Sequence, residues 1–119
     1  MALKEYDPHE AIDFIFKTAP QYAKASGELA QLEAFRHSLK AIKMAQTDEQ
    51  SLGGQEREAY RSQEYQDLCK AIGVATENKE ALRWQLEAAK MRFEAWRTQQ
   101  ANDRQIERLT RWESLQKYI

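Results

Sequence analysis

A row of basic residues is the feature of this sequence most suited to binding another molecule. Its members recur every seven residues through the last third of the chain: Arg83, Lys90, Arg97, Arg104 and Arg111. On a helix this repeat forms a nearly straight cationic line, and Arg108 adds a further charge beside it. Such a line can bind the phosphates of a nucleic acid or the carboxylates of another helix. The sequence leaves both alternatives open.

An apolar seam runs beside the basic row and must position it. Its residues are spaced by alternating threes and fours, with Lys79 in one place: Leu68, Ile72, Ala75, Leu82, Leu86, Ala89, Phe93 and Trp96. A seam of this kind packs against another helix. Glu80, Glu87 and Glu94 form a parallel acidic row. We expect them to pair with residues such as Arg83 and Lys90 along the helix.

A second apolar stripe lies opposite the seam. Trp84 and Met91 stand one heptad apart on this side, and Trp84 is also a candidate for stacking on bases. A later stripe restarts beyond the seam, at Ile106, Leu109, Trp112, Leu115 and Ile119. Exposed apolar residues of this kind favour an interface. We therefore predict a homo-oligomer whose interface includes Trp84, Met91, Leu109 and Trp112.

Signatures of catalysis and of cofactors are missing from the sequence. It has no phosphate-binding glycine loop, no paired Cys/His metal spacing and no Gly-x-Ser-x-Gly motif. The single cysteine, Cys69, follows Leu68 in an amphipathic stretch, which predicts a buried thiol. We therefore predict a protein that is not an enzyme, with no catalytic residue, no cofactor and no metal site.

Composition indicates a helical protein without a membrane segment. Glycine and proline are sparse, and 18 basic residues face 19 acidic ones. Residues 47–82 carry four basic and eight acidic side chains, whereas residues 83–119 carry eight and five. This asymmetry suits a head-to-tail contact or a polyanion partner. No signal peptide or apolar run of membrane-spanning length is present, so we expect a soluble protein of the bacterial cytoplasm.

The chain reads as a single all-α domain over residues 1–119. Asp7 and Pro8 predict a helix start, and the proline at position 20 predicts that this first helix ends by residue 19. We expect a long helix over 20–46, with Tyr22, Ala25, Leu29, Leu32, Phe35, Leu39 and Ile42 on one face. Residues 47–62 predict a loop containing Gly53 and Gly54, then a short helix.

Ser62 is placed to cap the last helix, over residues 63–119, which could break near residue 100 at Asn102-Asp103. The predicted architecture is therefore an antiparallel hairpin of two long helices. A short N-terminal helix and a C-terminal helical arm complete it.

The layout resembles small helical accessory proteins of phage and prophage recombination modules, and the UvsY-type recombination mediators of T-even phages. The residues that carry the resemblance are Tyr22-Ala23, Leu39–Met44, Gln55–Tyr60, Tyr65, Leu82–Trp84 and Ala89–Arg97. It implies an oligomeric, non-catalytic protein that binds single-stranded DNA and helps to load a recombinase. A phage recombinase or single-strand-binding protein would be its partner.

Two functions remain open from the sequence. In the first, the chain is a DNA recombination accessory factor that contacts phosphates through Arg83, Lys90, Arg97, Arg104, Arg108 and Arg111, with Trp84 as a stacker. In the second, it is a helical interaction module that docks on a host or phage protein. Its basic row then pairs with carboxylates of a neighbour, such as Glu56, Glu58, Glu64 and Asp67.

Overall fold

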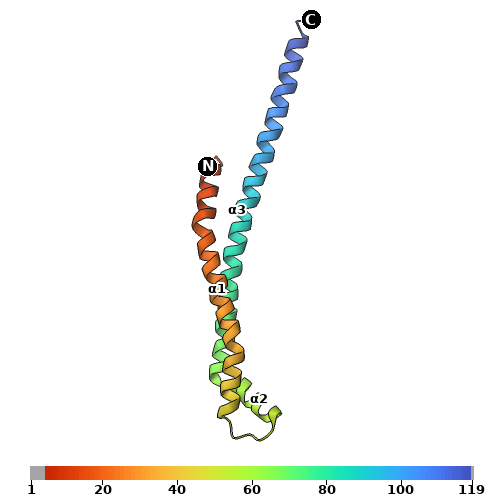
Figure 1. Ribbon diagram of the computed structural model, residues 1–119. Coiled ribbons are helices and arrows are strands. Elements are labelled where there is room, and N and C mark those ends of the chain that lie inside the picture. The colour runs from red at the N-terminus through yellow and green to blue at the C-terminus, as the bar shows by residue number, and fades with distance from the viewer. Residues whose placement is uncertain (1–4, 119) are drawn as a thin grey trace, which may run out of the picture. The chain divides into compact units, whose positions relative to one another are not determined.

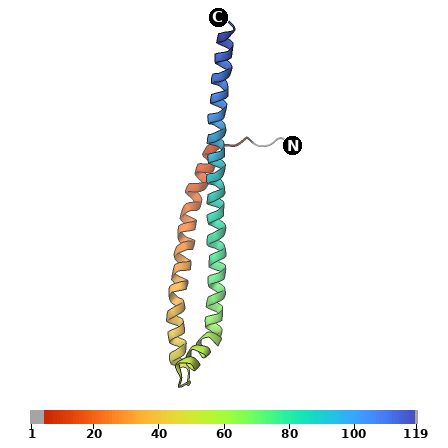
Figure 2. The same cartoon turned by 90° about the vertical axis from the view of Figure 1, so that its right-hand side faces the viewer.

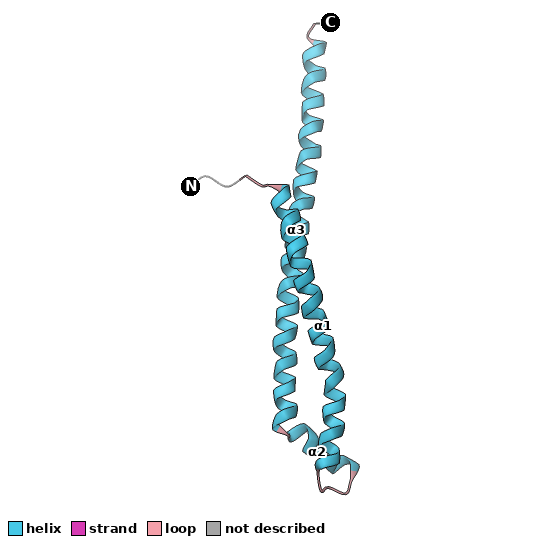
Figure 3. Cartoon of the chain, turned by 60° about the vertical axis from the view of Figure 1, so that its left-hand side comes forward, coloured by secondary structure: helices cyan, strands magenta, loops and turns pink. Residues whose placement is uncertain are grey.

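The computed structural model describes residues 5–118, so residues 1–4 and Ile119 of the predicted stripe lie outside it. The described residues form three helices, α1 (Pro8–Gln46), α2 (Leu52–Arg61) and α3 (Gln63–Gln116), and no strand (Figures 1 and 3). The all-α prediction is confirmed. The chain divides into two compact units, which are described separately. We call residues 18–84 the hairpin unit, and residues 1–17 with 85–119 the arm unit.

The hairpin unit is an antiparallel pair of helical segments. The part of α1 from residue 18 runs against the part of α3 up to residue 84, and α2 lies at the turn between them (Figure 2). Its buried residues are mostly small or aliphatic: Thr18, Ala25, Leu29, Leu39, Ala59 and Leu68. None of the described large side chains is completely buried. Two helices side by side therefore give a core that is one layer thick.

The predicted seam of α3 is confirmed in both units. In the hairpin unit Leu68 is buried, and Ile72, Ala75, Lys79 and Leu82 are half-buried. In the arm unit the seam residues are again half-buried: Leu86, Ala89, Phe93 and Trp96. The alternation of threes and fours thus marks the inward side of α3, as expected for coiled-coil packing.

The predicted helix end before Pro20 is wrong, because α1 continues through this residue. Proline lacks the N–H that would bond to the carbonyl of Phe16, which stands four residues earlier. Pro20 is exposed and Phe16 is 75% exposed, so water can reach this side of the helix. Thr18 and Ala25 are buried on either side of the proline. Packing on that opposite side favours a continuous helix and offsets the lost hydrogen bond.

The predicted apolar face of α1 needs a correction at its end. Phe35 and Ile42 are 47% and 46% exposed, whereas Arg36 and Lys43 are half-buried one residue further on. A strict heptad from Tyr22 reaches these two basic residues, and their aliphatic stems cover the apolar surface while their charged ends reach water or a carboxylate. Lys43 Nζ lies 3.2 Å from Glu64 Oε2.

The turn between the long helices is shorter than predicted. Only residues 47–51 lie between α1 and α2, and Gly53 and Gly54 belong to the first turn of α2. Ser51 Oγ accepts a hydrogen bond from the Gly54 N–H at 3.0 Å and caps this helix. Ser62 separates α2 from α3 and accepts a bond from the Tyr65 N–H at 3.3 Å, so its predicted capping role is confirmed.

Substituting alanine for Gly27 and Gly73 should stabilise the protein. Both glycines lie within helices, and a Cβ atom at either position meets nothing within 4 Å. Each change should raise the free energy of unfolding by about 0.5–1 kcal/mol in a urea titration followed by circular dichroism. Gly54→Ala is the matched control, because its Cβ would lie 2.9 Å from the capping Ser51 Oγ. An equal gain from this control would contradict the prediction.

The last helix is unbroken, and the possible break near residue 100 does not occur: α3 continues through Asn102 and Asp103 to Gln116. The expectation of a buried thiol is also wrong, because Cys69 is exposed. It follows the buried Leu68 by one residue, and this 100° rotation turns it out of the seam.

Candidate binding surfaces

Arg83 and Trp84 form the part of the predicted site that lies in the hairpin unit. The Arg83 guanidinium donates to Glu80 Oε2 through Nε at 2.9 Å and Nη2 at 2.7 Å. Its Cζ atom also lies 4.7 Å from the centre of the Trp84 ring. The Trp84 side chain is 57% exposed. Arg83 is therefore held by a carboxylate and an aromatic ring of its own helix.

The next two basic residues of the row, in the arm unit, are also paired along the helix. Lys90 Nζ lies 3.3 Å from Glu87 Oε1, and Arg97 Nη1 lies 3.4 Å from Glu94 Oε1. The expected pairing between the acidic and basic rows is thus confirmed. These pairs are exposed, and each contributes only about 0.3–0.5 kcal/mol. A stronger anion could displace such a glutamate, but three of the five charges of the row are compensated in the free protein.

The end of the basic row differs from its beginning. Arg104, Arg108 and Arg111 are exposed, and no ion pair formed within residues 5–118 involves them. Glu107 lies three residues after Arg104 and four residues before Arg111, but it forms no ion pair with either within residues 5–118. Three exposed guanidinium groups, spaced by four and three residues, therefore lie along one side of α3 without an ion-pair partner within residues 5–118.

These arginines lie on the C-terminal arm, which we define as residues 97–116 of α3. Every residue of the arm is exposed. Its apolar side chains are more than half exposed: Ile106 at 61%, Leu109 at 54%, Trp112 at 59% and Leu115 at 59%. The arm thus carries the apolar content of a packed helix without a packing partner in the described chain (Figure 1). Met91, the remaining predicted interface residue, is 59% exposed and precedes the arm.

The acidic residues proposed as partners of the basic row are already engaged inside the hairpin unit. Glu56 pairs with Lys40 at 3.6 Å, Glu58 with Arg61 at 3.4 Å and Glu64 with Lys43 at 3.2 Å. Asp67 Oδ1 accepts a hydrogen bond from Gln63 Nε2 at 2.7 Å. An arginine of another molecule would therefore have to displace an internal partner before it could pair with any of these four carboxylates.

In two of these internal pairs the pKa of one member is shifted. The pKa of Lys40 is raised, chiefly by the side chain of Tyr60 and also by the charge of Glu56. The pKa of Glu64 is lowered, first because its carboxylate accepts from its own backbone N–H at the start of α3, and second because of Lys43. Both shifts favour the charged forms that tie α1 to the turn of the hairpin.

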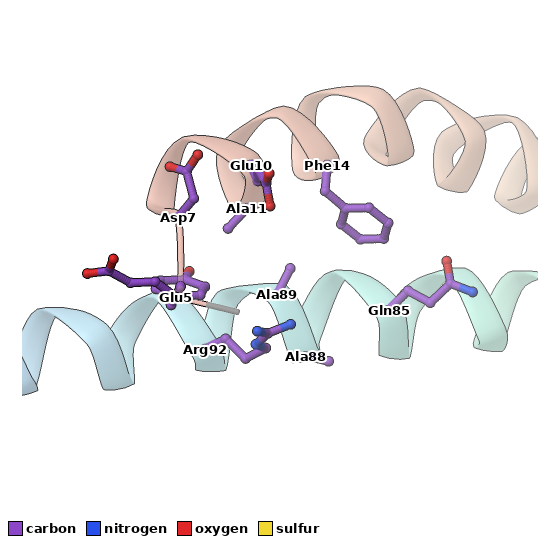
Figure 4. A pocket seen from close by; sticks show the side chains of 10 residues that line it. Glu5, Asp7, Glu10, Ala11, Phe14, Gln85, Ala88, Ala89 and Arg92 are labelled. Atoms are coloured by element: carbon purple, nitrogen blue, oxygen red, sulfur yellow. The ribbon is translucent and has the colours of Figure 1, made fainter. Parts of the chain in front are cut away.

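A groove in the arm unit was not anticipated from the sequence. It lies between the first turns of α1 and residues 85–92 of α3, with a volume of about 420 Å³. Its apolar lining comes from residues of both helices: Ala11, Phe14, Ala88 and Ala89. Figure 4 shows Ala11 and Phe14 pointing from α1 towards α3, with Ala89 pointing back. Three acidic residues also line it: Glu5, Asp7 and Glu10.

Tyr6 lines the groove and packs against α3. Its ring lies 6.3 Å from that of Trp96, and the Arg92 guanidinium stands over it at 5.3 Å. The Asp7 side chain accepts from the His9 N–H at 2.9 Å, so Asp7 caps α1 as predicted and Tyr6 precedes the cap. An apolar residue before the cap commonly packs on the first turns of a helix. Tyr6 was not predicted from the sequence, and this pattern is the signal that could have identified it as a packed residue.

The described residues give no metal centre and no membrane segment. Within residues 5–118, no group of three or more His, Cys, Asp or Glu side chains is arranged to hold a metal ion. None of the helices in this range is long and apolar enough to cross a membrane. Comparisons with protein-family models, curated protein sequences and solved structures found no match to this chain.

Proposed function

We propose that the chain is a non-enzymatic helical interaction module that binds another protein through its C-terminal arm. The observation that carries this proposal is the exposure of Ile106, Leu109, Trp112 and Leu115 on a helix with no packing partner in the described chain. In proteins most of the stability of a helix comes from packing of its apolar face rather than from the helix itself. A partner that covers this apolar stripe would supply the missing packing energy.

A comparison of arm variants tests this function. Tagged protein is mixed with a nuclease-treated extract of the source cells, and Leu109→Glu with Trp112→Glu should abolish capture of the bound protein. Val74→Glu is the matched control, because Val74 is 67% exposed on α3 but lies in the hairpin unit. Retention of all bound protein by the double variant would show that the arm is not the docking surface. Circular dichroism checks that both variants stay helical.

Binding to single-stranded DNA is the second candidate function. It is favoured by the exposure of Arg104, Arg108 and Arg111, which lack carboxylate partners within the described chain. Trp112 lies among them and could stack on a base. This candidate retains the role expected from the resemblance to recombination mediators, including delivery of a recombinase to the strand. The pairing of Lys90 and Arg97 with glutamates limits it to the end of the row.

Fluorescence anisotropy with a labelled oligo-dT strand separates the two functions. If the three arginines contact phosphates, the logarithm of the association constant should fall by about two for each unit rise in the logarithm of salt concentration. Arg104→Glu with Arg108→Glu should then remove binding, whereas Arg57→Glu, an exposed change on α2, should have little effect. Absence of binding at low salt would exclude this candidate and leave the protein-binding function.

A further inference from the structure

We propose that the groove of the arm unit is the receptor for the C-terminal arm of a second copy of this chain. This inference rests on the proposed function and names its partner. The groove has an apolar lining of Ala11, Phe14, Ala88 and Ala89, and the arm carries exposed leucines and Trp112. Small alanines in a groove leave room for a large side chain from a partner, and tryptophan is a frequent anchor at such sites.

Charge complementarity favours the C-terminal arm as the segment that binds in the groove. Glu5, Asp7 and Glu10 line the groove, and Arg104, Arg108 and Arg111 accompany the apolar stripe of the arm. Arginines of the arm would therefore face carboxylates when Trp112 enters the groove. Arg92 also lines the groove, but its guanidinium lies over the Tyr6 ring.

The arm cannot fill the groove of its own molecule. Groove residues 85–92 and stripe residues 106–115 belong to the same unbroken helix, and their nearest members lie 14 positions apart. This separation corresponds to about 20 Å along the helix axis. An arm in the groove must therefore come from another molecule.

Sedimentation velocity over a range of concentrations, in the presence of a reductant, tests the proposal. The average mass of the wild-type protein should rise with concentration. Trp112→Glu in the arm and Ala88→Arg in the groove should each weaken association by about thirtyfold or more, as expected for loss of an interface anchor. Ala81→Arg is the matched control for the groove, because Ala81 is an exposed alanine of α3 in the hairpin unit. It should leave association unchanged.

Mixing the two defective variants provides a test that does not depend on loss of binding. The Ala88→Arg protein retains a normal arm, and the Trp112→Glu protein retains a normal groove. Together they should form a one-to-one complex although each alone stays monomeric, which also shows that both are folded. A wild-type protein that remains monomeric, association that survives Ala88→Arg, or failure of the mixture to associate would overturn the proposal.

Sedimentation and capture together distinguish an arm that binds a different protein from an arm that binds no protein. If the chain is monomeric and arm-dependent capture from the nuclease-treated extract persists, then the arm binds a different protein and only the identity of the partner is wrong. If capture is also unaffected by Leu109→Glu with Trp112→Glu, the proposed function itself is wrong.

Discussion

Replacing Pro20 with alanine should raise the free energy of unfolding by about 2–3 kcal/mol. The proline lies inside α1, where it removes the hydrogen bond to the carbonyl of Phe16 and crowds the preceding turn. Alanine restores the N–H donor and has the highest helix propensity. Pro20 is exposed, so the change removes no buried contact.

Pro8→Ala is the matched control for this experiment. Pro8 is the first residue of α1, directly after the capping Asp7, and a first-turn N–H has no helical acceptor to lose. Its replacement should change the free energy of unfolding by less than about 0.5 kcal/mol. Urea titrations of both variants give the comparison. An unchanged stability of Pro20→Ala would mean that packing or solvation already compensates the whole cost of the proline.

Replacing Leu29 with alanine should lower the free energy of unfolding by about 2–3 kcal/mol. Leu29 is 7% exposed and belongs to the small buried core of the hairpin unit. Loss of its side chain removes apolar burial and leaves a gap, which together cost about 2–5 kcal/mol in well-packed proteins. We expect the lower part of this range because a core one layer thick can be refilled by water or by movement of the helices.

Leu52→Ala tests whether burial causes this effect. It makes the same chemical change at the start of α2, where the leucine is 66% exposed. Its effect should stay within about 0.5 kcal/mol of zero. Urea denaturation monitored by circular dichroism measures both. Equal losses in the two variants would show that the buried core of the hairpin does not dominate stability.

The seam of α3 could be predicted from its sequence because its apolar residues from Leu68 to Trp96 recur at alternating spacings of three and four. The face of α1 was harder to assign. Phe35 and Ile42 are more apolar than Arg36 and Lys43, yet the basic residues occupy the half-buried positions of α1. The long aliphatic stems of Arg36 and Lys43 can cover the apolar surface, which their classification as charged residues does not reveal. The continuation of α1 through Pro20 could not be predicted from local sequence. The residue before a proline disfavours the helical conformation, but burial on the opposite side of the helix outweighs this preference.

The binding surfaces were predictable to different degrees. The heptad of basic residues predicted their shared side of α3 and the pairing with Glu87 and Glu94, because both depend only on helical spacing. The groove depends on Tyr6, Phe14 and Ala88 coming together from distant parts of the chain. Two aromatic residues and an alanine carry no recognisable spacing, so this site required the fold.

The exposure of Cys69 has a consequence for the redox behaviour of the chain. It is the only thiol of the protein, and it stands at the surface of α3 in the hairpin unit. An oxidant could therefore join two molecules covalently through an intermolecular disulfide. The same thiol allows one maleimide or nitroxide probe to be attached per molecule at a known position, with no competing site.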